Sequence, residues 1–209
     1  MSYSEFSLSK VKKIFDLTTF EKPKIFANIP ELDCSEYLHK TLSYNVSLAL
    51  ASNTEKARSE MIITPILIEV RKYLQSQISL FSGVDFNVEQ ELGLNGYCDF
   101  ILSSGWEQLF VSAPVLMLVE AKNEDLKGGI GQCVAEMYAA QLFNEREGND
   151  IPIIYGAVTS GTNWKFIKLT KKVVEIDLSE YYLASLTKIF GILVHSIREA
   201  LNLQRFPVC

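Results

Sequence analysis

The sequence is poor in the residues that bind transition metals through nitrogen and sulfur. It has four cysteines and two histidines among 209 residues, and no two cysteines form a C-x-x-C pair. Structural zinc sites need closely spaced Cys and His ligands, so a zinc-binding fold of that kind is excluded. Cysteines without such pairing favour a reduced setting, and we expect a cytoplasmic protein.

The sequence also lacks an excess of positive charge. Its 20 Lys and Arg stand against 25 Asp and Glu, which gives a formal net charge of −5. A basic field over the whole chain, of the kind that attracts nucleic-acid phosphates, is therefore absent. Any nucleic-acid partner would have to be met by a local basic patch.

Long apolar runs are missing as well. The first ten residues, MSYSEFSLSK, contain no apolar segment typical of a signal peptide. No stretch of about 18 apolar residues occurs either, so we expect no contact with a membrane. What the chain does have is 48% hydrophobic residues, enough for a sizeable core. We expect a core domain over 52–209 and an N-terminal extension over 1–51 that packs on it.

The spacing of apolar residues changes several times along the chain. Residues 1–35 predict a short helix and an irregular lead-in, and residues 36–51 fit a strand or a helix equally well. Beyond them the pattern predicts helices over 54–79, 125–147 and 179–203, and strands over 85–93, 97–104, 115–122, 152–160, 162–169 and 171–177. This order predicts an α/β fold, with one mixed central sheet and helices on its faces.

Four local signals mark the boundaries of these elements. Ser52 and Glu55 have the spacing of a capping box, and Asp125 is expected to cap the second long helix. Pro65 should kink or restart the first long helix. Asn95-Gly96 is typical of a hairpin turn between two strands.

Charged residues end the strongly apolar stretch VLMLV at 115–119. Glu120 and Lys122 follow it two residues apart, so both should point to the same face of a strand. If strands 97–104 and 115–122 are antiparallel neighbours, Asp99 lies beside Glu120. Two close carboxylates repel each other unless a cation lies between them, and Mg²⁺ prefers oxygen ligands of this kind. A single E-x-K is common by chance, and its simplest reading is a surface ion pair.

The combination of these elements resembles the PD-(D/E)XK nuclease superfamily, which has the restriction-endonuclease-like fold. The resemblance rests on Asp99 in GYCDF, on Glu120-Ala121-Lys122 in LVEAK, and on the surrounding order of helices and strands over about 52–170. It implies an α-β-β-β-α-β core and hydrolysis of phosphodiester bonds by a water activated on Mg²⁺, with Mn²⁺ as a substitute. It also implies that Asp99, Glu120 and the Ala121 carbonyl hold the metal, while Lys122 positions the water. Cys98 stands where many members have a proline.

The resemblance also points to two residues on helices. Glu60 in ARSEMIITPIL matches an acid that members often carry in the first helix, and it shares a helix face with Ile63 and Leu67, so we expect it to point inward. Gln132 in GGIGQCVAEMYAAQ matches a glutamine that often faces the site. Glu136, one turn later, shares the face of Gln132. An exposed position on its helix is the simpler alternative for each.

Basic residues near the expected site are few. Lys165 and Lys168 lie on the strand 162–169, with Trp164 and Phe166 between them, and Arg58 precedes Glu60. These three are the candidates for contact with nucleic acid. The alternation of the strand puts Lys165 and Lys168 on opposite faces, so lysines that protect an exposed edge strand are the competing interpretation.

Three functions remain open from the sequence. The first is a Mg²⁺-dependent nuclease; we expect DNA as its substrate, although the sequence does not distinguish DNA from RNA. The second is a catalytically weak or inactive module of the same fold that binds nucleic acid or a protein. The third is an assembly subunit, because the apolar stripe of the last helix, from Tyr182 to Leu201, favours a covered face and a homodimer.

Overall fold

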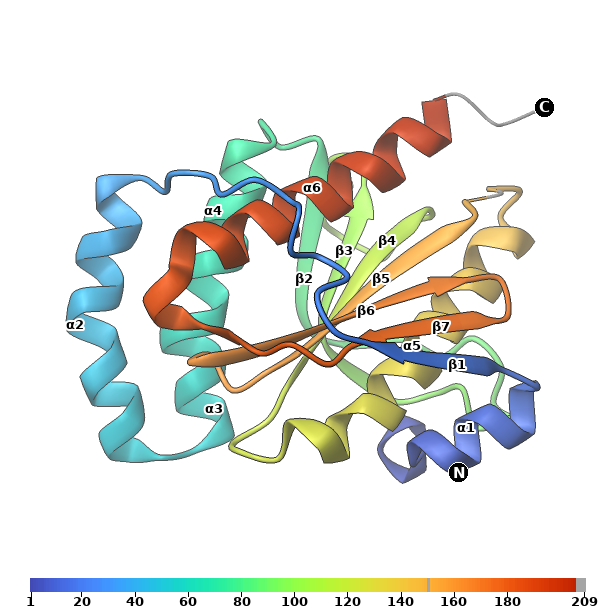
Figure 1. Cartoon of the computed structure of the whole chain (residues 1–209). Helices are drawn as coiled ribbons and strands as arrows, with labels where there is room; N and C mark the ends of the chain where they lie inside the picture. Colours follow the sequence, from blue (N-terminus) through green and yellow to red (C-terminus); the bar gives the residue numbers. More distant parts are fainter. Residues whose placement is uncertain (150, 206–209) are drawn as a thin grey trace.

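The computed structural model describes residues 1–149 and 151–205, with side chains described as far as Leu201. Its centre is a mixed sheet of eight strands, in the order β1-β7-β6-β5-β4-β3-β2 with β8 beside β6. The strands are β1 (Thr18–Lys22), β2 (Ile78–Asp85), β3 (Tyr97–Ser104), β4 (Val115–Ala121), β5 (Ile153–Thr159), β6 (Asn163–Thr170), β7 (Val173–Asp177) and β8 (Tyr181–Tyr182). Helices flank this sheet, so the predicted α/β architecture with one mixed sheet is confirmed (Figure 1).

One end of the sheet is an antiparallel meander, and a crossover follows it. β2 pairs with β3 and β3 pairs with β4, both antiparallel, whereas β4 and β5 are parallel. Parallel neighbours need a long connection, and helix α5 (Leu126–Arg146) provides it. All seven residues of β4 are buried, which explains why its sequence is a continuous apolar run rather than an alternating one.

The sheet is covered on both sides. α5 packs against β4 and β5, while α6 (Leu186–Arg205) crosses the opposite face near α4 (Thr64–Tyr73) (Figure 1). The approach of α5 depends on Gly156 in β5, because a Cβ atom there would lie 2.4 Å from Met137 Sδ. This close packing places the side chains of α5 directly over the carboxyl end of β4.

The helix expected over 54–79 is shorter and is interrupted. It consists of α3 (Glu55–Arg58), a π-helical segment η2 (Ser59–Ile63) and α4, which ends at Tyr73. Pro65 lies in the first turn of α4, directly after the π-helical segment, and the Met61 carbonyl four residues before it accepts a hydrogen bond from Asn45 Nδ2 at 3.0 Å. The predicted interruption at Pro65 is therefore confirmed. The predicted end near residue 79 is wrong, since α4 ends at Tyr73 and β2 begins at Ile78. The error arose because Leu74, Ile78 and Phe81 continue the helical spacing of apolar residues into the strand.

The strand expected over 85–93 is also wrong. β2 ends at Asp85, and residues 86–96 connect it to β3. Within this connection Glu89 and Leu94 form a single antiparallel bridge, and Phe86 is buried. The alternation of DFNVEQELG thus reflects a folded loop, and a period of two over so few residues does not distinguish it from a strand.

Residues 1–51 do more than pack on the outside of the core. They form η1 (Tyr3–Glu5), α1 (Leu8–Phe15), β1 and α2 (Glu36–Ser52). β1, which the sequence analysis missed, extends the sheet by pairing in parallel with β7. The ambiguous stretch 36–51 is helical, and Ser35 Oγ caps it by accepting a hydrogen bond from the Leu38 N–H at 3.2 Å.

The last helix uses its apolar stripe within the chain. Its buried residues include the predicted Leu186, Ile189, Leu193, Ile197 and Leu201, while Tyr182 precedes the helix and is exposed. This stripe therefore offers no surface to a second copy.

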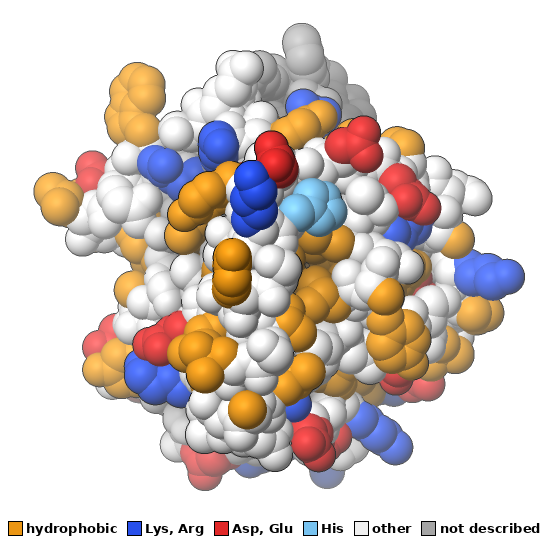
Figure 2. Space-filling model, turned by 90° about the vertical axis from the view of Figure 1, so that its left-hand side faces the viewer, with side chains coloured by type: hydrophobic (Ala, Val, Ile, Leu, Met, Phe, Trp, Pro, Cys, Tyr) orange, Lys and Arg blue, Asp and Glu red, His pale blue; other side chains and the backbone are white. Residues whose placement is uncertain are grey.

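Apolar side chains gather instead on the outer face of α2, where Tyr37, Tyr44 and Leu48 are exposed (Figure 2). A homodimer stays a prediction. A search of the described helices finds none that is both long and apolar enough to cross a membrane.

Candidate active site

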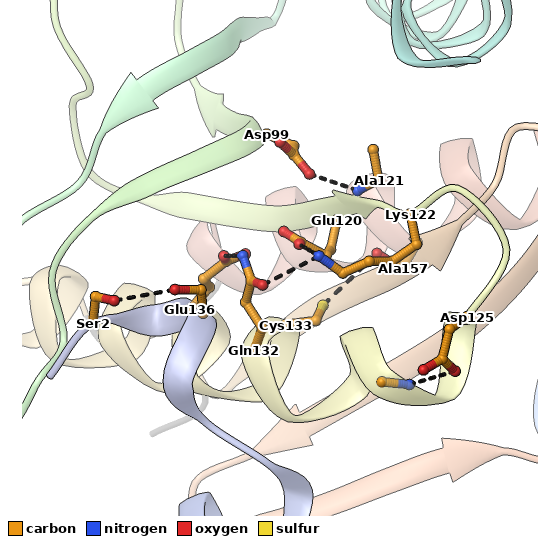
Figure 3. A network of polar contacts seen from close by, with 12 residues as sticks. Ser2, Asp99, Glu120, Ala121, Lys122, Asp125, Gln132, Cys133, Glu136 and Ala157 are labelled. Atoms are coloured by element: carbon orange, nitrogen blue, oxygen red, sulfur yellow. Dashed lines mark hydrogen bonds and ion pairs between the residues drawn. The ribbon is translucent and has the colours of Figure 1, made fainter. Parts of the chain in front are cut away.

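The carboxyl end of β4 brings the predicted acids together. The last paired residues of β3 and β4 are Phe100 and Val119, so the next residues along each strand, Asp99 and Glu120, meet at the same end of the sheet. The Asp99 side chain reaches the backbone of β4, where Oδ2 accepts a hydrogen bond from the Ala121 N–H at 2.8 Å (Figure 3). The predicted approach of Asp99 to Glu120 is confirmed.

Glu120 and Lys122 form an ion pair in a mostly buried position. Lys122 Nζ lies 2.5 Å from Glu120 Oε1, and the two side chains are 24% and 1% exposed. The aliphatic stem of Lys122 lies over Gly129 in the first turn of α5, where a Cβ atom would come within 3.0 Å of Lys122 Cγ. A residue with a side chain at position 129 would displace the ammonium group, so Gly129 helps to define its place.

A chain of hydrogen bonds continues from Lys122 into α5. Lys122 Nζ donates to Gln132 Oε1 at 3.3 Å, and Gln132 Nε2 donates to Glu136 Oε1 at 3.0 Å (Figure 3). Gln132 therefore faces the site, in agreement with the prediction from the resemblance. Glu136 is completely buried. In the described part of the chain, Glu120 Oε2 and Glu136 Oε2 are both buried without a hydrogen-bond partner.

The electrostatics of this cluster follow from its burial. Burial raises the pKa of Glu120 to about 8; the Asp99 carboxylate adds to the rise, and the Lys122 ammonium opposes it. Burial also raises the pKa of Glu136 well above its ordinary value, and Glu120 contributes to that shift. Burial tends to lower the pKa of Lys122, but Glu120, Glu55 and Asp99 together outweigh it and the pKa is raised. Three carboxyl groups near one ammonium favour the uptake of further positive charge, as protons or as a metal ion.

A cleft opens beside Asp99 and Ala121. Its volume is about 230 Å³, and its lining includes Glu55, Glu60, Asp99 and Ala121. Glu60 therefore lies at the cleft, but the inward orientation expected for it is wrong: its side chain is 58% exposed and pairs with Lys56 at 2.9 Å. The π-helical turn at residues 59–63 changes the helical phase on which that expectation rested.

Glu55 is a member of the site that sequence reasoning missed. It lines the cleft, and its charge contributes to raising the pKa of both Glu120 and Lys122. In the sequence Glu55 looked only like the second half of a capping box. The signal that could have found it is its position in the first turn of the helix that also carries Glu60.

The residues at the cleft suit a hard cation. Asp99 offers carboxylate oxygens to the cleft, which Ala121 also lines, whereas Glu120 is not among the lining residues and is 1% exposed next to them. The buried Glu120 Oε2, which lacks a partner among the described residues, is an oxygen of the kind that Mg²⁺ binds. The described residues contain no group of three or more His, Cys, Asp and Glu side chains arranged to hold a metal.

Arg58 is buried beneath the site rather than presented on its surface. Its guanidinium donates to Asn123 Oδ1 at 2.9 Å, to the Ser160 carbonyl at 3.2 Å and to Asn53 Oδ1 at 3.2 Å. These partners lie on the end of α2, the β4–α5 loop and the β5–β6 turn. Arg58 therefore ties together three loops next to the end of β4, and its donors are not directed at a nucleic acid.

Replacing Arg58 with methionine is expected to lower the free energy of unfolding by about 3 kcal/mol, because three buried or half-buried acceptors lose their donor. Urea unfolding of R58M beside the wild type measures this change. The exposed neighbour Lys56, replaced in K56M, is the matched control and should change stability little. Unchanged stability in R58M would contradict the structural role and leave Arg58 available as a surface contact.

The two candidate lysines of β6 are engaged within the chain. Lys165 Nζ donates to the carbonyls of Asp177 and Leu178 at 3.5 and 3.4 Å. Lys168 Nζ lies 3.5 Å from Glu199 Oε1 and 5.8 Å from the centre of the Tyr155 ring. The structure therefore does not bring Lys165 and Lys168 together into one patch, and their contact with nucleic acid stays a prediction.

Comparison with known proteins adds no relative to this picture. The chain matches no protein-family model, and a search of curated proteins finds no significant match.

Proposed function

We propose that this protein is a Mg²⁺-dependent nuclease that hydrolyses phosphodiester bonds of DNA. One observation carries the proposal: Asp99, Glu120 and Lys122 come together at the end of two neighbouring strands, where Asp99 lines a cleft and the buried Glu120 Oε2 has no partner in the described part of the chain. An ion pair retained at a buried strand end costs desolvation, so its presence there favours a chemical role over a structural one.

The order of elements around the site supports the same proposal. A helix that carries Glu60 is followed by the β2–β3–β4 meander, by α5 with Gln132, and by β5 parallel to β4. The sequence resemblance implies this succession for a restriction-endonuclease-like core. Asp99 then stands in the second strand of the meander, and Glu120-Ala121-Lys122 stands at the end of the third.

The residues of the site have distinct tasks in this reaction. Asp99, Glu120 and the Ala121 carbonyl would hold the ion, which when bound supplies Lewis acidity and acidifies a water ligand. Lys122, fixed by Glu120 and Gln132, offsets negative charge that develops on the phosphate and orients the attacking water. Glu60 and Glu55 lie at the mouth of the cleft, where they can contact waters of the ion.

Titration calorimetry with Mg²⁺ and Mn²⁺ tests the site without knowledge of the substrate. We expect the wild type to bind both ions and D99N to bind at least about tenfold more weakly, since Asn keeps an acceptor for the Ala121 N–H but loses the charge. E36Q, which removes an exposed carboxylate on α2, should bind like the wild type. Equal binding by the wild type and D99N would contradict the metal site.

The alternative is a module of this fold that binds a partner without cutting it. The charge of the cleft favours it: among the lining residues Lys56 is the cation, and it is already paired with Glu60. A wild-type protein that takes up neither ion, alone or with a DNA duplex present, would move the conclusion to this alternative.

A further inference from the structure

The buried Glu136 is the polar group at the site that the proposed chemistry does not use. It lies one helical turn after Gln132 and is completely buried beneath it. Its one hydrogen bond within the described chain is the one that Oε1 accepts from Gln132 Nε2 at 3.0 Å. A buried carboxyl group with an unpartnered oxygen is costly, so a hydrophobic residue of similar size would serve packing better.

The hydrogen bond from Gln132 to Glu136 has a directional consequence. A glutamine amide has a donor end and an acceptor end, which can exchange places by a rotation of the amide group. Glu136 Oε1 accepts from the NH₂ end, so the carbonyl oxygen of Gln132 turns the other way, toward Lys122 Nζ at 3.3 Å. If the amide were turned the other way, the NH₂ group of Gln132 would face the ammonium group of Lys122, and neither group could accept a hydrogen bond from the other.

We propose that Glu136 is a positioning residue that acts through Gln132: it selects the amide orientation that holds the Lys122 ammonium against Glu120. The three side chains after Glu120 thus form one ordered chain, from the surface at Lys122 to the interior at Glu136. The assignment of Lys122 to the reaction rests on the proposed function. The placement of its ammonium group rests only on the hydrogen bonds among these residues.

The same pair of residue types occurs elsewhere on α5 and provides a control. Gln141 Nε2 donates to Glu145 Oε1 at 3.1 Å, also four residues apart, but Glu145 is exposed and the pair lies at the far end of the helix. An effect that belongs to any Gln–Glu pair on this helix would appear when either glutamate is replaced. An effect on Lys122 should appear only with Glu136.

NMR of protein labelled with ¹⁵N-lysine tests the proposal on the protein alone. The Lys122 ammonium signal is assigned by its absence in K122M, and its hydrogen exchange with water is measured in E136M, E136Q and E145M. In E136M we expect exchange to rise about tenfold, because Gln132 loses the acceptor that orients it. E136Q keeps an oxygen at the same place, so exchange should stay within about threefold of the wild type. E145M should match the wild type.

Two further results make the test decisive. Q132M removes the middle link from a half-buried position and should raise Lys122 exchange as E136M does, which covers the case in which E136M fails to fold. Unchanged exchange in E136M and Q132M would overturn the proposal, and so would an equal rise in E136Q and E136M. Since no substrate or metal is added, these outcomes are independent of whether the protein proves to be a nuclease.

Discussion

K122M is expected to lower the rate of DNA cleavage by about 10³-fold while the protein stays folded. Methionine keeps an unbranched stem that can lie over Gly129, but it has no ammonium to place beside a phosphate. Glu120, left without its partner, can bind a proton instead, since its pKa is already raised to about 8. The measurement is cleavage of plasmid DNA and of single-stranded oligonucleotides in Mg²⁺ or Mn²⁺, beside thermal unfolding.

K56M is the matched control for this loss. Lys56 lines the cleft itself, but it is exposed and paired with Glu60, so its removal should change cleavage only a few-fold. Equal losses in K56M and K122M would mean that general positive charge, rather than the position of Lys122, supports the reaction. Cleavage by K122M at the wild-type rate would remove Lys122 from the proposed mechanism.

The stability of the metal-free protein is expected to fall as pH rises from about 4.5 to about 8. The folded state holds a proton on Glu120 up to pH of about 8, whereas the unfolded chain releases it at the ordinary glutamate pKa of about 4.5. Between these values the folded state binds more protons, so each pH unit costs up to about 1.4 kcal/mol of the free energy of unfolding. The charges of Asp99, Lys122 and Glu55 act on the pKa of Glu120, and Glu120 in turn raises the pKa of Glu136.

E120Q isolates the contribution of Glu120 to this slope. Glutamine has a similar shape but does not titrate, so the decline of stability between pH 5 and 8, as followed by urea unfolding, should become shallower. Mg²⁺ should act in the opposite sense in the wild type, because binding at Glu120 requires the carboxylate and therefore strengthens with pH. A decline that is equally steep in E120Q and the wild type would contradict the raised pKa of Glu120.

Local patterns in the sequence were sufficient for much of the scaffold. The apolar run at 115–119 became the buried β4, the N-cap at Asp125 began α5, and the stripe of the last helix became its buried face. Each of these depends on neighbours within one or two turns of the chain, where the physical cause is local. The convergence of Asp99 on Glu120 also followed, because antiparallel pairing of adjacent strands sets the partner of each residue.

Errors arose where two elements share one apolar spacing. The helix that ends at Tyr73 and the strand β2 both present apolar residues at intervals that fit a helix, so periodicity did not locate the boundary. β1 was missed because its five residues are mostly exposed, and only its parallel pairing with β7 makes it a strand. Strand formation there depends on a partner more than 150 residues away.

By itself, therefore, the sequence determined the α/β class, the end of β4 and the three residues Asp99, Glu120 and Lys122 that meet there. Only the tertiary structure decided the environment of these groups. It turned Glu60 outward at a π-helical segment, buried Arg58 among three loops, and joined Lys122 to Glu136 through Gln132. Burial and hydrogen-bond partners come from segments that are distant in sequence. They set the charge and orientation of each side chain, whereas a sequence motif gives only its residue type and spacing.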